Sequence, residues 1–509
     1  IKASAGGGGK GMRIINDFSE IEESFLIATN EAKKSFNDSR VFLEKYISNP
    51  HHIEIQILGD KFGNYIFFGE RECSIQRRNQ KVIEEAPSPF ISEKTRILMG
   101  AQAISLAREV NYHSAGTVEF IVDENENFYF LEMNTRLQVE HPVTELVYNV
   151  DLVKKMIEIS CGKKLDILQS EVKSKGHAVE SRIYAEDPFK SFLPSTGRLT
   201  RYKPPLESQT EDEIIRNDTG VYEGGEISIY YDPMISKLCT WGKSRSLAIH
   251  SMKKALDNFE IEGINHNIPF LSAVFDNLEF GSGNYTTAFI EKNYPNGFKW
   301  IFAERNLKTL MKAFAASLYL ILEERKVISF DKEKSNKLFQ KKLTIIDYKD
   351  KNQVIISKNK KIFKFRILGG NSIEFETDWK PGKSLAMMKI NNEKKYFKIK
   401  IDCLNFSIYF REFKLDMTIL ETRLADLYDY MISNSEEQSL KDVNCPMPGL
   451  LVSFFVNEGD LVQEGDSLCI VEAMKMENII KSERKGKIKK INVVEGETLS
   501  VNQVILEFE

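Results

Sequence analysis

The 509-residue sequence lacks the long apolar runs, paired cysteines and strong net charge that mark several classes of protein. No apolar run approaches the ~20 residues that a membrane-spanning helix needs, and no charged-then-apolar leader opens the chain. The six cysteines lie far apart with no CxxC pair, which argues against a zinc site or disulfide framework and favours a reducing compartment. The net charge of -4 predicts neither a basic nucleic-acid surface nor an acidic disordered tail. We therefore expect a soluble protein with no nucleic-acid partner and no membrane segment.

The sequence does have length, enough for about three or four domains. The opening residues, Ile1 to Ser4, include no initiator Met and run directly into Gly6 to Gly9. We therefore expect the sequence to be a fragment of a longer chain. The many Lys, Asn and Ile residues are typical of an AT-rich bacterial genome. They favour a cytoplasmic location over the mitochondrial matrix that a eukaryotic source would imply.

An internal repeat with an offset of about 37 residues begins after Pro446. Segment 449–460 aligns with 486–497, and 467–472 aligns with 504–509. Both copies show short Val, Ile and Leu runs broken by Gly, Asp and Asn, which predict strands and tight turns. Two such halves predict a small all-β sandwich with pseudo-two-fold symmetry. The first half ends in a predicted turn over 472–477.

Lys475 lies in this turn, between Met474 and Met476. Large apolar side chains beside an exposed amine predict a surface that another protein recognises. The Ala-Met-Lys-Met sequence, with Pro-Met-Pro-Gly at 446–449, closely resembles the biotinyl domain of biotin-dependent carboxylases, which shares its fold with the lipoyl domain. The resemblance implies that a biotin protein ligase joins biotin to Lys475, so that the tethered ring visits two active sites at high effective concentration.

A glycine run, Gly6 to Gly9, lies near the start of the sequence and is followed by Lys10 and Gly11. It is not a Walker A loop, because that motif needs Ser or Thr after the lysine. It is not a dinucleotide fingerprint either, because segment 12–15 predicts a strand and the next helix begins later, at a Ser19-x-x-Glu22 capping box. A glycine loop between two strands suits a flap whose backbone N–H groups fold over phosphates.

Strands rich in polar side chains follow the glycine run. Segment 70–81 is dense with side chains that hold anions. Glu119, Glu132 and Asn134 lie on a predicted β-hairpin and offer the hard oxygen ligands that Mg²⁺ requires. Beyond them, polar groups at every other position predict a strand that continues to Glu140. The segments with strand patterns are 41–47, 51–56, 116–122 and 130–142. In the first of these, the apolar part ends at Glu44.

These motifs, in this order, resemble the biotin carboxylase branch of the ATP-grasp family from Lys2 to about residue 300. The resemblance implies that Glu140 is the general base that deprotonates bicarbonate as it attacks ATP, and that Arg182 neutralises the biotin enolate. It implies that Mg²⁺ or Mn²⁺ is held by Glu119, Glu132 and Asn134. It implies bicarbonate binding by Lys81, Arg136, Gln138 and Val139. It implies ATP binding by Lys2, Gly8, Gly9, Glu44, Lys45, Ile47, His52 and Gln76.

The middle of the chain predicts one long apolar helix over about 306–326, followed by eight strand-like runs between 343 and 420. A helix wrapped by antiparallel strands resembles the domain through which propionyl-CoA and related carboxylases dock their carboxyltransferase subunit. A short helix over 421–431 and a polar linker, which lets the biotinyl domain swing, are expected next.

We therefore expect a multidomain α+β protein with an ATP-grasp biotin carboxylase core, a helix-plus-antiparallel-β-barrel docking domain and a C-terminal biotinyl sandwich. Fusion of carboxylase and carrier argues against the separate-subunit acetyl-CoA system, and the lack of a carboxyltransferase sequence argues against a pyruvate carboxylase-type chain. The expected divisions are an N-terminally incomplete ATP-grasp domain at 1–160, a biotin carboxylase C-terminal domain at 161–300, the docking domain at 301–432, a linker at 433–442 and the carrier at 443–509.

The expected function is that of the α subunit in a hetero-oligomeric acyl-CoA carboxylase with a separate carboxyltransferase β subunit, acting on propionyl-CoA. Two alternatives stay open. One is a 3-methylcrotonyl-CoA carboxylase α subunit. The other is a biotin carrier and scaffold with an inert carboxylase half, because the family's N-terminal nucleotide-binding subdomain and a further ATP-contacting lysine would lie upstream of Ile1.

Overall fold

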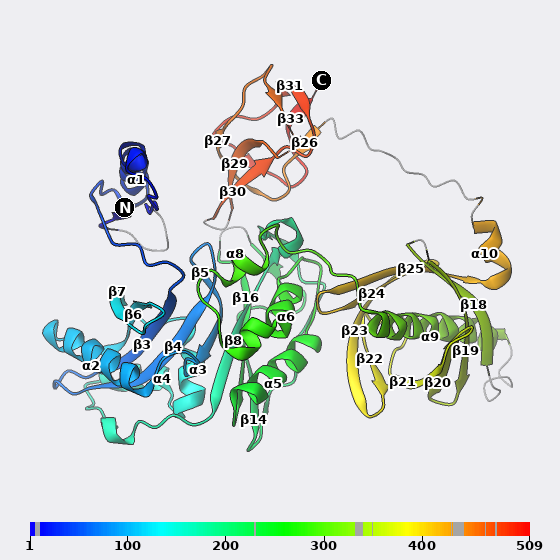
Figure 1. Cartoon of the computed structure of the whole chain (residues 1–509), viewed down its shortest axis with the longest axis horizontal. Coiled ribbons are helices and arrows are strands. Elements are labelled where there is room, and N and C mark those ends of the chain that lie inside the picture. The colour runs from blue at the N-terminus through cyan, green and yellow to red at the C-terminus, as the bar shows by residue number, and fades with distance from the viewer. Residues whose placement is uncertain are drawn as a thin grey trace.

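The computed structural model describes residues 1–5, 11–228, 231–330, 339–348, 350–428, 430, 442–463, 465–473 and 476–508. In chain order these form a small N-terminal unit, a large sheet with helices, a barrel around a helix, and a small β-sandwich (Figure 1). Gly8, Gly9 and Lys475 lie outside the described residues, as does the predicted linker apart from Asp442. None of the helices within the described ranges is long and apolar enough to cross a membrane.

The N-terminal unit pairs β1 (Lys2–Ala3) with β2 (Val41–Phe42) beside α1 (Ile21–Phe36), which follows the 3-10 helix η1 (Phe18–Glu20). The strand expected over 12–15 is wrong, because Met12 forms only an isolated bridge to Lys2 and residues 13–15 lie outside any strand. The strand expected over 41–47 is confined to β2, so Glu44 lies outside it.

The capping box expected at Ser19 and Glu22 is also wrong. Asp17 accepts hydrogen bonds from the backbone and the hydroxyl of Ser19, at 2.8 and 2.6 Å, and so caps η1 two residues earlier. Asp is as good an N-cap residue as Ser, so the earlier carboxylate takes the role.

A nine-stranded sheet forms the centre of the molecule, with the order β13-β14-β16-β8-β5-β4-β3-β6-β7 and antiparallel pairing throughout. Its strands come from both sides of residue 160, so the two regions expected as separate domains share one sheet. The strands are β3 (His51–Gly59), β4 (Tyr65–Arg77), β5 (Gln80–Ala86), β6 (Ser114–Val122), β7 (Phe128–Asn134), β8 (His177–Tyr184), β13 (Ser208–Gln209), β14 (Glu213–Thr219) and β16 (Met234–Gly242).

Both faces of β3 are buried, and they differ in chemistry. Ile53, Ile55 and Ile57 pack in an apolar cluster with residues of α2 (Glu93–Glu109). Because successive side chains in a strand alternate, His52 and Glu54 point to the opposite face, and they too are buried. A buried polar face on a central strand is costly unless its groups are paired, and it lies where the candidate site is found.

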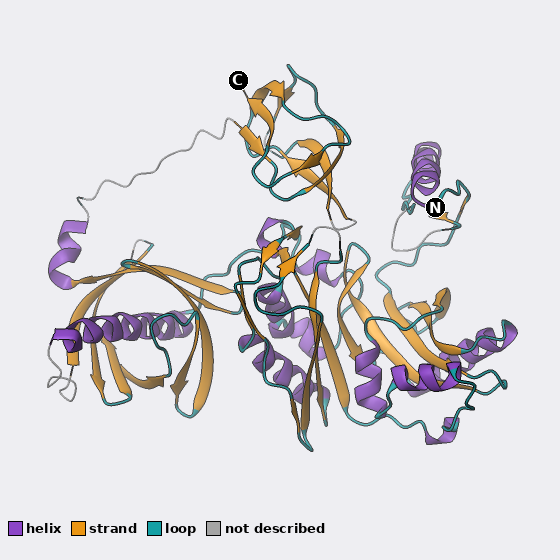
Figure 2. Ribbon diagram, turned by 180° about the vertical axis from the view of Figure 1, so that it is seen from behind, coloured by secondary structure: helices purple, strands orange, loops and turns teal. Residues whose placement is uncertain are grey.

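Among the described residues, six further α-helices, two 3-10 helices and six short strands complete this part of the molecule, and Figure 2 shows helices against the sheet. A second apolar cluster joins β8 and β16 to α5 and α6. The helices are α3 (His141–Tyr148), α4 (Leu152–Ser160), α5 (Arg245–Asp257), α6 (Ile268–Asp276), α7 (Leu278–Ser282), α8 (Phe289–Asn293) and, as 3-10 turns, η2 (Gln169–Glu171) and η3 (Pro188–Lys190). The strand pairs are β9 (Glu186–Asp187) with β10 (Leu193–Pro194), β11 (Gly197–Arg198) with β15 (Glu226–Ile227), and β12 (Arg201–Lys203) with β17 (Glu260–Glu262).

The strand expected to continue to Glu140 is wrong beyond Asn134. β7 ends at Asn134, and Glu140 lies at the N-cap position of α3. Pro142 in the first turn of α3 is compatible with a helix start and poorly suited to a central strand, which is the physical reason for the change. The alternation of polar side chains therefore does not place Arg136 and Glu140 on one strand face.

The expected helix and eight strands in the middle of the chain are confirmed. The helix α9 (Arg305–Phe330) is enclosed by a closed antiparallel barrel, and every residue from 311 to 320 is buried. A helix that is buried all round must be surrounded, as Figure 1 shows for α9. The barrel strands are β18 (Phe339–Asp347), β19 (Asp350–Asn359), β20 (Ile362–Ile367), β21 (Ser372–Thr377), β22 (Leu385–Ile390), β23 (Glu393–Asp402), β24 (Asn405–Phe410) and β25 (Phe413–Glu421), followed by α10 (Thr422–Tyr428).

The turn between β24 and β25 contacts the helices of the central part. Arg411 lies in this turn and forms ion pairs with Asp257 at the end of α5, at 3.0 Å, and with Asp276 at the end of α6, at 2.8 Å. The barrel is thereby attached to the helical layer through a guanidinium held between two carboxylates.

The C-terminal part is the expected sandwich of two four-stranded sheets, β26-β33-β31-β28 and β30-β29-β27-β32. Each sheet takes strands from both copies of the internal repeat. The strands are β26 (Asp442–Asn444), β27 (Gly449–Phe454), β28 (Leu461–Val462), β29 (Ser467–Ala473), β30 (Met476–Lys481), β31 (Gly486–Ile491), β32 (Thr498–Leu499) and β33 (Val504–Phe508). β29 and β30 are antiparallel neighbours and flank the position of Lys475.

Candidate active site

Three carboxylates lie in a row across β3, β6 and β7. Glu54 is directly opposite Glu119, and Glu119 is directly opposite Glu132. Like charges directly opposite one another on neighbouring strands repel, so this row needs compensating groups. Asn134 donates to Glu119 at 3.0 Å and to Glu132 at 3.2 Å, and His52 Nε2 lies 3.0 Å from Glu119. The row is therefore a concentration of oxygen donors that favours a cation.

The donor chemistry fits a hard divalent cation. Glu119, Glu132 and Asn134 are adjacent across β6 and β7 and offer carboxylate and amide oxygens. Within the described ranges, His52, Glu54 and Glu119 also place one possible ligand atom each within 4.8 Å of one another. The expected Mg²⁺ or Mn²⁺ ligands thus form one cluster, with carboxylates as its main donors.

Lys81 is the cation that the protein itself supplies to this row. Its Nζ lies 2.5 Å from Glu54, 3.0 Å from Glu119 and 2.7 Å from Glu140. Burial alone would lower the pKa of Lys81, but Glu54 and the neighbouring carboxylates raise it well above its ordinary value. Lys81 therefore remains charged and links the metal-ligand cluster to Glu140.

Glu140 is buried between two cations. One carboxylate oxygen accepts from Lys81 at 2.7 Å and the other accepts from Arg182 at 2.8 Å. Burial would raise the pKa of Glu140, but Lys81 and Arg182 outweigh it and hold that pKa below the ordinary value. Glu140 is therefore ionised at neutral pH, with both of its oxygens engaged.

Arg71 connects five side chains of the site, a role that the sequence patterns did not predict. It is fully buried and donates five hydrogen bonds, to Glu54 at 2.5 Å and to the side chains of Gln56, Thr117, Gln138 and Thr144 at 2.7 to 3.1 Å. Its bond to Gln138 is 2.8 Å long, and Gln138 in turn donates to Glu119 at 2.5 Å. Arg71 thus fixes Gln138 against the metal-ligand cluster.

Sequence reasoning missed four residues of the cluster: Arg71, Glu54, Glu84 and Lys237. Lys237 donates from Nζ to the carbonyl of Val139 at 2.9 Å. The alternation of polar side chains with isoleucines in β3 could have identified Glu54 as a buried polar residue. Arg71 lies within a run of charged residues that looks like solvent-exposed sequence, so nothing local distinguishes it.

Several predicted site residues are not in this cluster. Arg136 is exposed, and its guanidinium donates to the carbonyl of the next residue at 3.2 Å. Gln76 donates to the carbonyl of Cys73 at 2.8 Å. In Figures 1 and 2 the helix α1 stands apart from the sheet. The predicted ATP contacts at this end of the chain are Lys2, Glu44, Lys45 and Ile47, and Lys2 Nζ lies 3.6 Å from Glu44.

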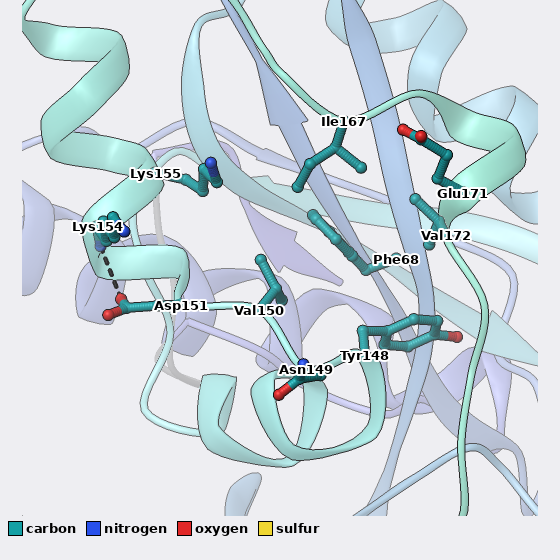
Figure 3. Close-up of a pocket in the computed structure, with 10 residues that line it drawn as sticks. All are labelled: Phe68, Tyr148, Asn149, Val150, Asp151, Lys154, Lys155, Ile167, Glu171 and Val172. Atoms are coloured by element: carbon teal, nitrogen blue, oxygen red, sulfur yellow. Dashed lines mark hydrogen bonds between the residues drawn. The ribbon is translucent and has the colours of Figure 1, made fainter.

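A separate cavity of about 260 Å³ lies at the other end of α3 (Figure 3). Phe68 and Ile167 point into it, with Tyr148 at its edge and Lys154 and Lys155 on the flanking helix. It contains none of the predicted site residues. The clustered titratable groups around Glu140, and not this cavity, are therefore the candidate active site.

Four family models match the chain and cover most of it. They are described as "Carbamoyl-phosphate synthase L chain, ATP binding domain" at residues 1–168, "Biotin carboxylase C-terminal domain" at 180–292, "Propionyl-coenzyme A carboxylase BT domain" at 312–433 and "Biotin-requiring enzyme" at 441–508. Their order matches the order of the parts in the structure.

Curated relatives match over the full length of the chain. It is 49% identical to the propionyl-CoA carboxylase alpha chain of Ruegeria pomeroyi, with 100% of this chain and 77% of the relative aligned. It is 42% identical to the mitochondrial propionyl-CoA carboxylase alpha chain of Homo sapiens, with 100% of this chain and 70% of the relative aligned.

A solved structure matches the central part. It is the biotin carboxylase domain of 2-oxoglutarate carboxylase from Hydrogenobacter thermophilus, in complex with MgADP, ADP and bicarbonate. The TM-score is 0.55 at 46% identity, covering 57% of this chain and 63% of that chain. The chain therefore spans somewhat less than two thirds of that solved chain.

Proposed function

The chain belongs to the family of propionyl-CoA carboxylase alpha chains, and on that premise we propose that it uses ATP and bicarbonate to carboxylate biotin carried on Lys475. The observation that carries the proposal is the buried Glu140 carboxylate held between Lys81 and Arg182, with Lys81 also bonded to Glu119. A base, two anion-binding cations and metal-ligating oxygens within one buried cluster are what ATP-dependent activation of bicarbonate requires.

In this proposal Glu140 accepts the proton of bicarbonate. In the structure both of its oxygens are engaged by cations, which keep it ionised but weaken it as a base. An anion that takes Lys81 or Arg182 as its partner removes part of that stabilisation and raises the basicity of Glu140. Substrate binding and activation of the base are then coupled through the same two cations.

The remaining side chains bind and orient. Gln138, fixed by Arg71, presents an amide to bicarbonate, and Lys237 fixes the carbonyl of Val139, the next expected bicarbonate contact. Glu119, Glu132 and Asn134 would hold Mg²⁺ or Mn²⁺, which supplies charge neutralisation for the transferring phosphate. When bound, biotin supplies a ring nitrogen that takes up the carboxyl group, and Arg182 contributes the charge that stabilises its anionic form.

We also propose the partners and the division of labour. A biotin protein ligase would attach biotin at Lys475, a separate carboxyltransferase β subunit would bind the barrel around α9, and the carrier at 443–509 would move between the two sites. The acyl-CoA would be propionyl-CoA. The same proposal includes a bacterial cytoplasmic location. It also includes the division of the chain at 1–160, 161–300, 301–432 and 433–442.

The test is carboxylation of free biotin by the full-length protein with ATP, Mg²⁺ and ¹⁴C-bicarbonate. We expect acid-labile ¹⁴C in biotin that depends on both ATP and Mg²⁺. Glu140→Gln keeps the shape of the side chain but removes the base, and we expect it to lower kcat by at least about 100-fold, as removal of a general base does.

The matched control is Glu145→Gln on the same short helix, where Glu145 pairs with Arg216 at 2.8 Å outside the cluster. We expect this variant to retain most of the activity. An inactive but folded and biotinylated wild-type protein would favour the carrier-and-scaffold alternative. Equal losses in the two variants would show that Glu140 has no special role.

A further inference from the structure

Arg182 is held from two sides by buried carboxylates. Its Nη2 donates to Glu140 at 2.8 Å, as the proposed mechanism requires, and its Nε donates to Glu84 at 2.6 Å. Glu84 lies on β5 and is fully buried, and nothing in the mechanism so far uses it. Burying a carboxylate costs free energy of folding, so a buried carboxylate such as Glu84 is expected to have a function.

Geometry gives that reason. The Nε edge of a guanidinium fixes the plane of the whole fork, because all of its N–H groups lie in that plane. Glu84 bonds Arg182 at this edge, while Nη2 of the same fork donates to Glu140. Without Glu84, the Nε edge of Arg182 would lose its carboxylate partner, and Glu140 and the Tyr184 hydroxyl would be left as polar partners of the guanidinium.

Glu180 provides a comparison residue in the same place. It lies directly opposite Glu84 on β8, is equally buried, and accepts from the Cys239 thiol at 3.2 Å. Burial, and then the Glu84 carboxylate, raise the pKa of Glu180 to about 8. Burial raises the pKa of Glu84 to about 7, although Arg182 acts in the opposite direction. Glu180 is therefore the carboxyl of the pair that holds a proton more tightly, and Glu84 is the one bonded to the cation.

We propose that Glu84 is a positioning residue for biotin carboxylation, which acts by orienting the guanidinium of Arg182 toward the reacting groups. The proposal rests on the carboxylase function proposed above. Within the part of the chain that the structure describes, Glu84 donates to and accepts from no predicted metal ligand, and its hydrogen-bond partner is Arg182, through which the proposed effect runs. A misdirected guanidinium lowers the rate of the step that needs its charge and leaves ATP binding unchanged.

The experiment measures free-biotin carboxylation by the full-length protein and its Glu84→Gln variant at saturating ATP and bicarbonate. We expect kcat to fall by about 10- to 100-fold, the range that small misplacements of catalytic groups produce, with KM for ATP changed less than about twofold. Glu180→Gln is the matched control, because an amide closely replaces a protonated carboxyl at the same depth. We expect it to retain wild-type kcat.

A double-mutant cycle shows whether the effect runs through Arg182. In an Arg182→Lys background the fork is absent, so adding Glu84→Gln should have little further effect, and the two losses should not multiply. Glu84→Asp retains the charge and should recover part of the lost kcat. If Glu84→Gln does not fold, Glu84→Asp provides the test in its place. Circular dichroism measures the folded fraction of each variant, and kcat is compared at equal folded fraction.

Three results would overturn the proposal, and the first two are equal kcat in Glu84→Gln and wild type, and losses that multiply in the double variant. A rise in KM for ATP as large as the fall in kcat would also overturn it, because that would indicate general distortion of the site. If the wild-type protein carboxylates no biotin, the proposed function itself fails and this proposal falls with it. An active wild type with an unaffected Glu84→Gln variant refutes the positioning role alone.

Discussion

Replacing Arg71 by Met is the most severe single test of how the candidate site is held together. The substitution keeps much of the volume but removes the guanidinium and its five hydrogen bonds. Removing one partner of a buried ion pair costs about 3–5 kcal/mol, because the other charge is left uncompensated. Glu54 keeps Lys81 at 2.5 Å, so we expect the lower end of that range. A loss of about 3 kcal/mol corresponds to roughly a 150-fold change in the opening equilibrium of the sheet.

The assay is native-state hydrogen exchange of the amides in β3, β4 and β6, which reports the opening of this sheet without assuming that the whole chain unfolds together. We expect roughly 150-fold faster exchange in Arg71→Met and no change in Arg40→Met, whose exposed guanidinium pairs with Asp38. KM for bicarbonate should rise as well, because Gln138 loses the bond that orients it. Exchange accelerated by less than about tenfold would refute the argument that Arg71 compensates the buried carboxylates.

Three further predictions concern other parts of the molecule. Lys475→Arg should abolish the streptavidin gel shift of the expressed protein, and a surviving shift would mean that another lysine carries biotin. Glu85 pairs with His177 and Arg245 at 2.5 and 2.6 Å, and these partners, against the effect of burial, lower its pKa to about 2. The stability difference between wild type and Glu85→Gln should therefore be full above about pH 4.5 and shrink as the pH falls toward 2, and a constant difference would contradict this. Arg411→Met should release the barrel from the helical layer and increase the radius of gyration measured by X-ray scattering. An unchanged radius of gyration would contradict this.

The parts of the structure that depend on short-range patterns were predictable from sequence. The helix α9 and the eight strands of the barrel were expected because apolar periodicity and strand propensity are encoded within each segment. The strands β29 and β30 of the carrier were expected because the internal repeat is a local pattern. Two predictions near the N-terminus were wrong. The strand expected over 12–15 is reduced to one bridge between Met12 and Lys2, and Asp17 caps the first helical turn before Ser19 can do so.

The candidate site was only partly predictable, and the missing residues share a physical reason. Glu119, Glu132 and Asn134 were found because they alternate on one predicted hairpin. Arg71 and Glu84 were not found, because their partners lie on other strands, 98 residues away in the case of Glu84 and Arg182.

Taken by itself, the sequence determined the order of the parts, and it predicted Lys475 as the site of biotin attachment and the hairpin of Glu119 and Glu132 as the metal site. Only the tertiary structure decided that Glu140 lies between Lys81 and Arg182, that Arg136 stays exposed, and that buried carboxylates hold the arginines in place. Local patterns encode which face of a strand is buried, but the charge state and orientation of a buried group depend on neighbours that the sheet brings together from distant positions.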